Sequence, residues 1–73
     1  MTPLTVRVNR AEFVEDLVSS FRRSGYNAKR TGPWTCAVVH EDTLDAQEAR
    51  VEVMFFLRAW GARLSGAQAS LAV

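Results

Sequence analysis

Apolar and polar residues in the first third of the chain follow two different periods, which predict a strand and then a helix. Residues 4–8, Leu-Thr-Val-Arg-Val, alternate apolar and polar side chains, as a strand with one buried face does. Between Phe13 and Phe21 the apolar residues recur at steps of three and four, which is the spacing of an amphipathic helix. Gly25 is the expected end of this helix, because glycine readily takes the left-handed conformation of a C-terminal cap.

A capping pattern occurs twice along the chain. Asn9 stands three residues before Glu12, and Asp45 stands three residues before Glu48. An Asn or Asp side chain can accept a hydrogen bond from the free N–H groups of a first helical turn, and an acidic residue three positions later completes a capping box. We therefore expect Asn9 to cap the first helix and Asp45 to cap a second one.

The middle of the chain predicts two strands joined by a turn at Gly32-Pro33. Residues 26–31, YNAKRT, read as a polar strand. Residues 34–40, WTCAVVH, are rich in β-forming residues and apolar on both faces, so they should form a central strand. Two sets of side chains are candidates for the exposed face of that strand: Thr35, Ala37 and Val39, or Trp34, Cys36, Val38 and His40.

The second helix has one clear core stripe. At 100° per residue, six apolar residues lie within about 60° of Val53: Ala46, Ala49, Phe56, Leu57, Trp60 and Leu64. The stripe predicts a buried Trp60 and a helix that continues past Gly61, although a stop at Gly61 stays open because a mid-helix glycine costs about 1 kcal/mol. Residues 67–73 alternate again and form a last strand. Trp34 follows a Gly-Pro turn and is expected to be at least partly exposed.

These elements give the order β-α-β-β-α-β, which is the ferredoxin-like plait of the α+β class. We expect two helices on one face of a four-stranded antiparallel sheet, with the other face open. The chain of 73 residues is long enough for one domain, spanning residues 1–73. A domain this small buries a modest core, and self-association is one way for it to gain stability.

A second apolar strip lies on the back of the second helix, opposite the core stripe. Val51, Met54 and Phe55 form it, and Arg58 stands at its edge. We expect these four residues to be an interface, and another copy of the chain to be the partner. The alternative is that they are ordinary apolar surface residues, which are common in soluble proteins.

The segment RRSGYNAKRTGPW is a candidate for binding single-stranded nucleic acid. Its four basic residues have no acidic residue between them, and its two aromatic rings could stack on bases. The residues concerned are Arg22, Arg23, Tyr26, Lys29, Arg30 and Trp34. A net charge of only +1 is small for such a function. The alternative is a helix end with favourable arginines, followed by an edge strand kept soluble by its charges.

Composition argues against catalysis, metals and membranes. One cysteine and one histidine cannot form a disulfide or a structural zinc site. On a strand, Cys36 and His40 would lie about 13 Å apart, too far for a nucleophile and its base. The longest apolar block, residues 53–57, is far shorter than a membrane span. We expect no enzyme activity, cofactor, metal or membrane contact, and a cytoplasmic location.

Two resemblances add to this interpretation. The segment EARVEVMFFLRAW resembles short uncharacterised actinobacterial proteins with a Leu-Arg-x-Trp helix, and this likeness implies no known activity. The segment RRSGYNA, together with the order of elements, is similar to the sporulation-related repeat, which implies peptidoglycan binding. From the residues themselves we expect a non-catalytic interaction module that associates with itself, with nucleic-acid binding as the alternative.

Overall fold

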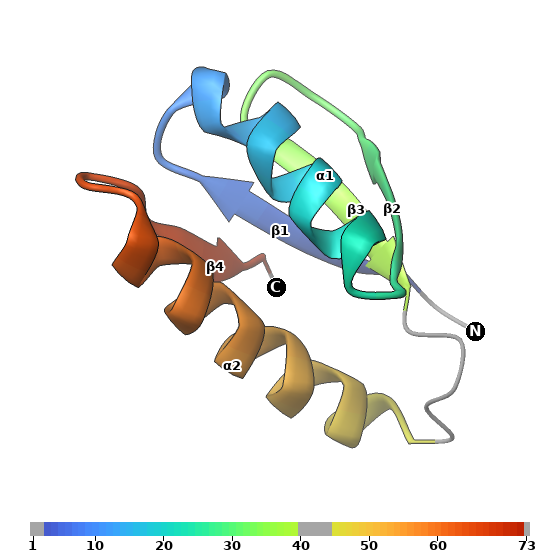
Figure 1. The fold of residues 1–73 in the computed structure, drawn as a ribbon. Coiled ribbons are helices and arrows are strands. Elements are labelled where there is room, and N and C mark those ends of the chain that lie inside the picture. Colours follow the sequence, from blue (N-terminus) through green and yellow to red (C-terminus); the bar gives the residue numbers. More distant parts are fainter. Residues whose placement is uncertain (1–2, 40–44, 73) are drawn as a thin grey trace.

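The computed structural model describes residues 3–39 and 45–72 of the chain. The first half contains β1 (Leu4–Val8), a short 3-10 helix η1 (Ala11–Phe13), α1 (Val14–Arg23) and β2 (Asn27–Arg30). The second half contains β3 (Thr35–Val39), α2 (Ala46–Arg63) and β4 (Ala69–Leu71). Figure 1 shows these elements in one layer of strands and one layer of helices. The expected order β-α-β-β-α-β is therefore confirmed.

The four strands form one antiparallel sheet in the order β2-β3-β1-β4. Each helix connects two strands that are not neighbours, as the ferredoxin-like plait requires. In Figure 1, α1 lies over β3 and beside β2, whereas α2 runs beside β4 at the other end of the sheet. The second helix therefore reaches beyond the sheet edge that β4 forms.

Alternating burial along the two central strands shows which face packs on the helices. In β1, Val6 and Val8 are buried, while Thr5 and Arg7 are exposed. In β3 the buried residues are Cys36 and Val38. The open face of β3 is therefore the set Thr35, Ala37 and Val39, which the alternation in the sequence alone did not decide.

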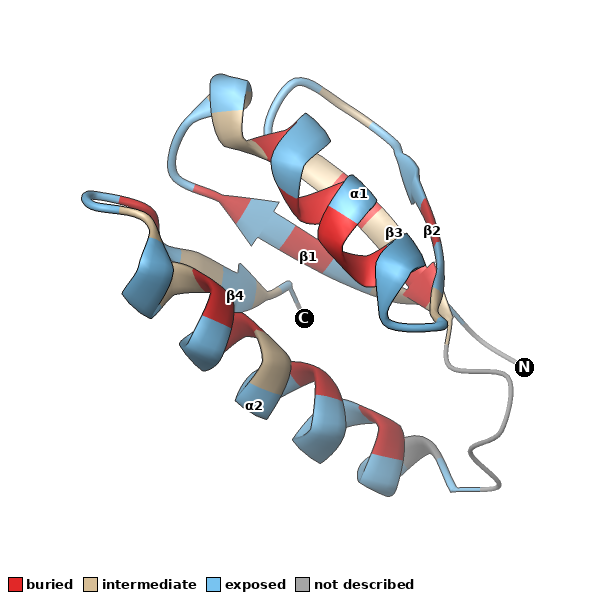
Figure 2. Cartoon of the chain, viewed as in Figure 1, coloured by how far each residue is buried: buried red, intermediate tan, exposed pale blue. Residues whose placement is uncertain are grey.

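The helices are held together by aromatic side chains between them. Trp60 of α2 is 1% exposed, as predicted, and its indole N–H donates to the Asp16 carboxylate of α1 at 2.8 Å. The ring of Phe13 meets the Trp60 ring edge-on at 6.2 Å. Near the C-terminal end of α1, Phe21 stacks at 4.3 Å on Phe56, which lies one turn before Trp60 in α2. Figure 2 shows the buried positions of α2 on the side that faces α1 and the sheet.

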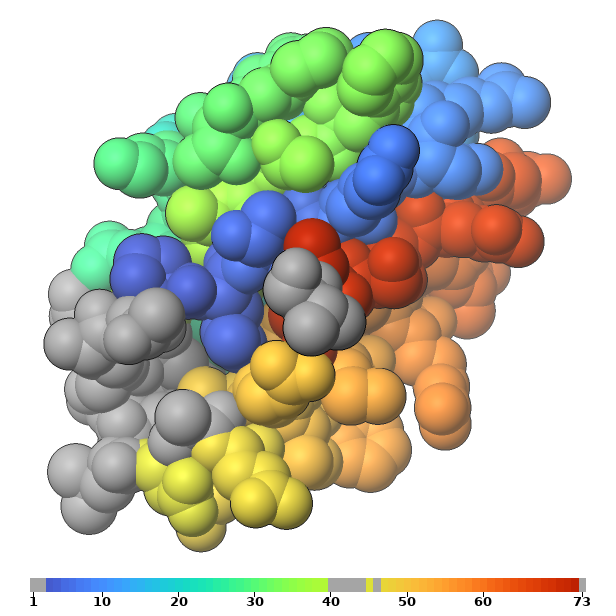
Figure 3. Space-filling view, turned by 180° about the vertical axis from the view of Figure 1, so that it is seen from behind, coloured from blue at the N-terminus to red at the C-terminus, as the bar shows by residue number. Residues whose placement is uncertain are grey.

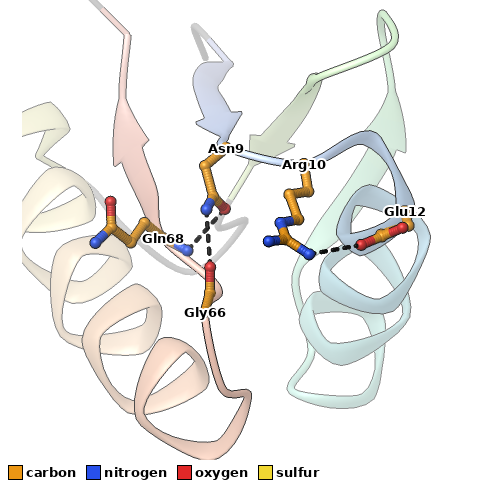
Figure 4. A network of polar contacts seen from close by, with 5 residues as sticks. All are labelled: Asn9, Arg10, Glu12, Gly66 and Gln68. Carbon is orange, nitrogen blue, oxygen red and sulfur yellow. Dashed lines mark hydrogen bonds and ion pairs between the residues drawn. The ribbon is translucent and has the colours of Figure 1, made fainter.

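The predicted cap at Asn9 is wrong. The Asn9 side chain donates to the main-chain oxygen of Gly66 and accepts from the main-chain N–H of Gln68, at 2.8 and 2.9 Å (Figure 4). The chain instead enters α1 through η1, whose N-terminal residue Arg10 makes no side-chain cap and pairs with Glu12 at 3.4 Å. Asn9 thus bonds to the main chain of a segment that precedes β4, 57 to 59 positions later in the sequence. Local spacing cannot reveal such a contact.

The second helix begins at its predicted cap and continues past Gly61, which is the longer of the two expected lengths. Asp45 caps α2, because its carboxylate accepts from the N–H of Gln47 at 2.9 Å, so this cap is confirmed. The helix passes through Gly61 and ends at Arg63, with Leu64 as its C-cap. A Cβ at Gly61 would lie 3.3 Å from the Ala67 carbonyl oxygen, so the absent side chain allows the chain to return closely against the helix.

Three further expectations concern Gly25, His40 and membrane spans. Gly25 follows α1 with φ of +92°, which confirms it as the left-handed stop. The side chain of His40 lies outside the described residues. Among the described residues, no helix is long and apolar enough to cross a membrane.

We expect Trp60→Ala to lower the free energy of unfolding by roughly 3–5 kcal/mol, because it removes a large buried side chain and the indole N–H that donates to Asp16. Trp60→Phe keeps most of the apolar bulk and should cost less. Trp34, which is 49% exposed, provides the control, since Trp34→Ala should unfold near the wild-type urea concentration. Urea unfolding followed by circular dichroism measures all three. Iodide quenching of Trp60 but not Trp34 would contradict this assignment.

We expect Asn9→Ala to lower the free energy of unfolding by about 1–2 kcal/mol, because two hydrogen bonds between distant segments are lost. Asn9→Asp keeps the acceptor for Gln68 but loses the donor for Gly66, so its stability should be intermediate. Gln68→Ala is the control, since only the main chain of Gln68 takes part in the contact. Thermal unfolding compares the variants, and an Asn9→Ala melt equal to that of the wild type would rule out this tether.

Candidate interaction site

The outer face of α2 carries three of the four large apolar side chains that are exposed among the described residues. Val51, Met54 and Phe55 are 45%, 54% and 64% exposed. The core side of the same helix is filled by Val53, Leu57 and Trp60. The exposed side chains therefore cannot turn inward without displacing these core residues. The predicted strip, Val51, Met54 and Phe55 with Arg58 at its edge, is therefore exposed on one face; we call it the α2 strip.

Charged side chains of opposite sign flank the α2 strip. On one side, Asp45, Glu48 and Glu52 line a shallow hollow of about 400 Å³ that also touches Val51. On the other side, Arg50 and Arg58 border a larger hollow together with Met54. The strip thus lies between an acidic and a basic margin of the same helix.

The larger hollow is a groove of about 880 Å³ between α2 and β4. Arg7 of β1 reaches it as well as Arg50 and Arg58, and no acidic side chain is among the described residues that line it. We call it the α2–β4 groove. Its floor is apolar, from side chains that include Leu57 and Leu71. Figure 3, which looks onto the open face of the sheet, shows side chains of α2 in yellow and orange beyond the edge of β4.

Arg7 and Arg50 are the charged residues of this groove that sequence reasoning did not assign to a site. They are 43 positions apart in the chain and belong to a strand and a helix. Both were recognisable as exposed arginines on amphipathic elements. Arg7 and Arg50 line the same groove because β4 pairs with β1 and lies beside α2.

The basic segment does not form one surface. Lys29 pairs in register with Ala37 and therefore lies on the open face of the sheet, whereas Arg30 lies on the helix side. Arg30 donates to the carbonyl oxygens of Gly32 and Pro33 and pairs with Glu15 at 3.2 Å. Its guanidinium is thus held by three partners of its own chain.

The remaining residues of the basic segment are also distributed over different environments. Arg22 donates to the carbonyl oxygen of Ala28 at 3.0 Å, and Arg23 donates to the hydroxyl of Ser20 at 3.2 Å. The ring of Tyr26 packs edge-on against Phe21 at 5.2 Å. Burial raises the pKa of Tyr26, and the negative charge of Glu52 adds to that effect. Trp34 is the one aromatic ring of the segment that stands out into solvent.

Cys36 is buried in the core at 0% exposure, and its thiol is free. Burial raises the pKa of Cys36 to about 11, so the thiol stays protonated at neutral pH and is a poor nucleophile. No group of three or more potential metal ligands occurs among the residues that the structure describes. The expectation of no catalysis therefore stays a prediction, with Cys36 acting as a small apolar core residue.

Comparisons with protein-family models, with curated proteins and with solved structures found no match for this chain. The α2 strip and the α2–β4 groove are therefore interpreted from their own geometry and charge.

We expect the free energy of unfolding to fall as the pH rises from about 9 to 11, in part because of Cys36. An unfolded thiol ionises near pH 9, whereas the folded one ionises near pH 11, so between these values the unfolded state releases a proton that the folded state retains. Tyr26, whose pKa is also raised, adds to the loss at the upper end. Cys36→Ala should show a smaller fall. Urea unfolding at several pH values compares the two proteins, and equal slopes would contradict this account.

Proposed function

We propose that the protein is a small non-catalytic interaction module that associates with a second copy of itself through the α2 strip. The observation that carries the proposal is the exposure of Val51, Met54 and Phe55 on one helix face, although a chain of 73 residues has little apolar area to spare. A buried free thiol suits a reducing compartment such as the cytoplasm, where we place the module.

The spacing of the strip residues supports an antiparallel pair of α2 helices. In such a pair with its two-fold axis level with Val53, positions whose numbers are equally far from 53 lie at the same height. Val51 then lies level with Phe55 of the second copy, and Arg58 lies level with its Glu48. The pair would bury apolar side chains at its centre and bring the long Arg58 side chain to the height of an opposite charge at both ends. Antiparallel helix dipoles are also favourable.

Nucleic-acid binding remains the alternative, with weaker support. The outward-facing residues of the described strands include Arg7 and Lys29 and no acidic side chain. No aromatic ring lies among those residues, and single-stranded binding sites depend on stacking. Since the basic segment is split between both faces of the sheet, we place self-association first.

We expect Phe55→Glu to weaken self-association by about tenfold or more, because it puts a charge at the centre of an apolar contact. Ser19→Glu is the matched control: it makes the same change of net charge at an exposed position of α1. Sedimentation equilibrium up to high micromolar concentration measures both. A wild-type protein that stays monomeric throughout would refute the proposal.

A charge exchange tests the antiparallel geometry. Arg58→Glu should weaken the dimer, because it places two acidic side chains together at each end of the contact. Adding Glu48→Arg restores opposite charges and should recover most of the lost affinity. Sedimentation at low salt compares the single and double variants. If the double variant is no tighter than Arg58→Glu alone, these two positions do not meet across the interface.

A further inference from the structure

The two edges of the sheet differ in how they are protected from further strands. In β2, Lys29 and Arg30 supply the charges that commonly prevent an edge strand from pairing. The sequence of β4, Ala-Ser-Leu, contains neither a charge nor a proline. The α2–β4 groove lies along this second edge.

The hydrogen bonds between β1 and β4 show which main-chain groups face the groove. The N–H of Ala72 donates to the Thr5 oxygen, and the N–H of Asn9 donates to the Gln68 oxygen. In an antiparallel ladder the residues between such pairs direct both N–H and C=O away from the partner strand. Ala69 and Leu71 therefore point these groups outward, and no hydrogen bond joins them to another described residue.

The arginines around this edge have no acidic partner among the described residues. The described part of the chain contains two ion pairs, formed by Arg10 and Arg30. Arg7, Arg50 and Arg58 take part in neither. The groove lining includes side chains from both faces of β4, with Leu71 toward the helices and Ser70 toward the open face. The hollow thus straddles the strand edge.

We propose that the α2–β4 groove binds an extended peptide that adds a strand to β4 and carries carboxylates alternating with apolar side chains. Side chains of an added strand point alternately to the two faces. Those on the helix side would meet Arg50, Arg58 and the apolar floor at Leu57. Those on the other side would meet Arg7. Main-chain groups of Ala69 and Leu71 supply the strand pairing.

The charge of the groove selects this occupant over two others. A second copy adding its own β4 would bring another set of unpaired arginines to the same place, which like-charge repulsion opposes. Single-stranded nucleic acid would find phosphate partners, but the described residues that line the groove include no aromatic ring for its bases to stack on. An acidic peptide satisfies the charges, the strand edge and the apolar floor together.

The test uses fluorescence anisotropy with a labelled Glu-Val-Glu-Val-Glu-Val peptide and the full chain. Binding should be saturable and should weaken with salt, since the exposed charges are screened over about 8 Å at 0.15 M. The same peptide with lysine in place of glutamate should not bind. A Glu-Pro repeat, which keeps the charge but lacks half of the main-chain donors, should bind more weakly. Equal binding of all three peptides would overturn the proposal.

Matched variants locate the site. Arg50→Glu should weaken peptide binding by about tenfold or more. Arg63→Glu changes net charge equally on the same helix, outside the groove, and should leave binding within about twofold of wild type. Ala69→Pro removes an outward N–H without breaking the ladder to β1, and should weaken binding by about threefold to tenfold. Circular dichroism checks that each variant is folded.

Self-association and peptide binding are separable by Phe55, which does not line the groove, and Arg50, which is not part of the α2 strip. Phe55→Glu should leave peptide binding intact, and Arg50→Glu should leave the sedimentation behaviour intact. Loss of the dimer in Arg50→Glu would mean that a second copy fills the groove, and the peptide proposal would fail. It would fail equally if oligouridine or oleate bound with the Arg50 dependence and the peptide did not.

Discussion

The contact between Trp60 and Asp16 is the interaction on which the arrangement of the helices depends. A buried indole must place its N–H on an acceptor, and the Asp16 carboxylate at 2.8 Å is the acceptor that α1 provides. A hydrogen bond to a charged group is worth about 1.5–3 kcal/mol, in addition to the apolar area that the ring buries. This contact fixes the rotation of α2 about its own axis, and that rotation determines which side chains of α2 face outward.

With α2 held in this way, its other faces are available for contacts. The helix extends past the edge of β4 instead of lying wholly over the sheet, so its outer surface meets solvent along most of its length (Figures 1 and 3). Acidic side chains lie on one margin of the exposed α2 strip and basic side chains lie on the other. We infer that one helix serves two partners: a second copy on the strip, and an acidic peptide in the groove beside it.

The small size of the domain explains why these surfaces gather at one end. Between β1 and α1 the core is complete, with Val6, Leu17 and Phe21 fully buried. At the β4 end a three-residue strand is attached by few ladder bonds and by the Asn9 side chain. A short, uncharged edge beside a basic helix flank is poorly suited to standing alone and well suited to pairing with another chain.

The sequence alone determined the element order, the buried Trp60, the Asp45 cap and the exposed strip, because each follows from residues within a few positions of one another. Side-chain periodicity records which face of an element is buried. The tertiary structure decided the role of Asn9, the outward face of β3 and the meeting of Arg7 with Arg50. Each of these depends on contacts between segments far apart in the chain: the return of residues 66–68 to β1, the register of β3, and the place of β4 at the sheet edge. Local spacing carries no information about such contacts, since they are set by how the whole core packs.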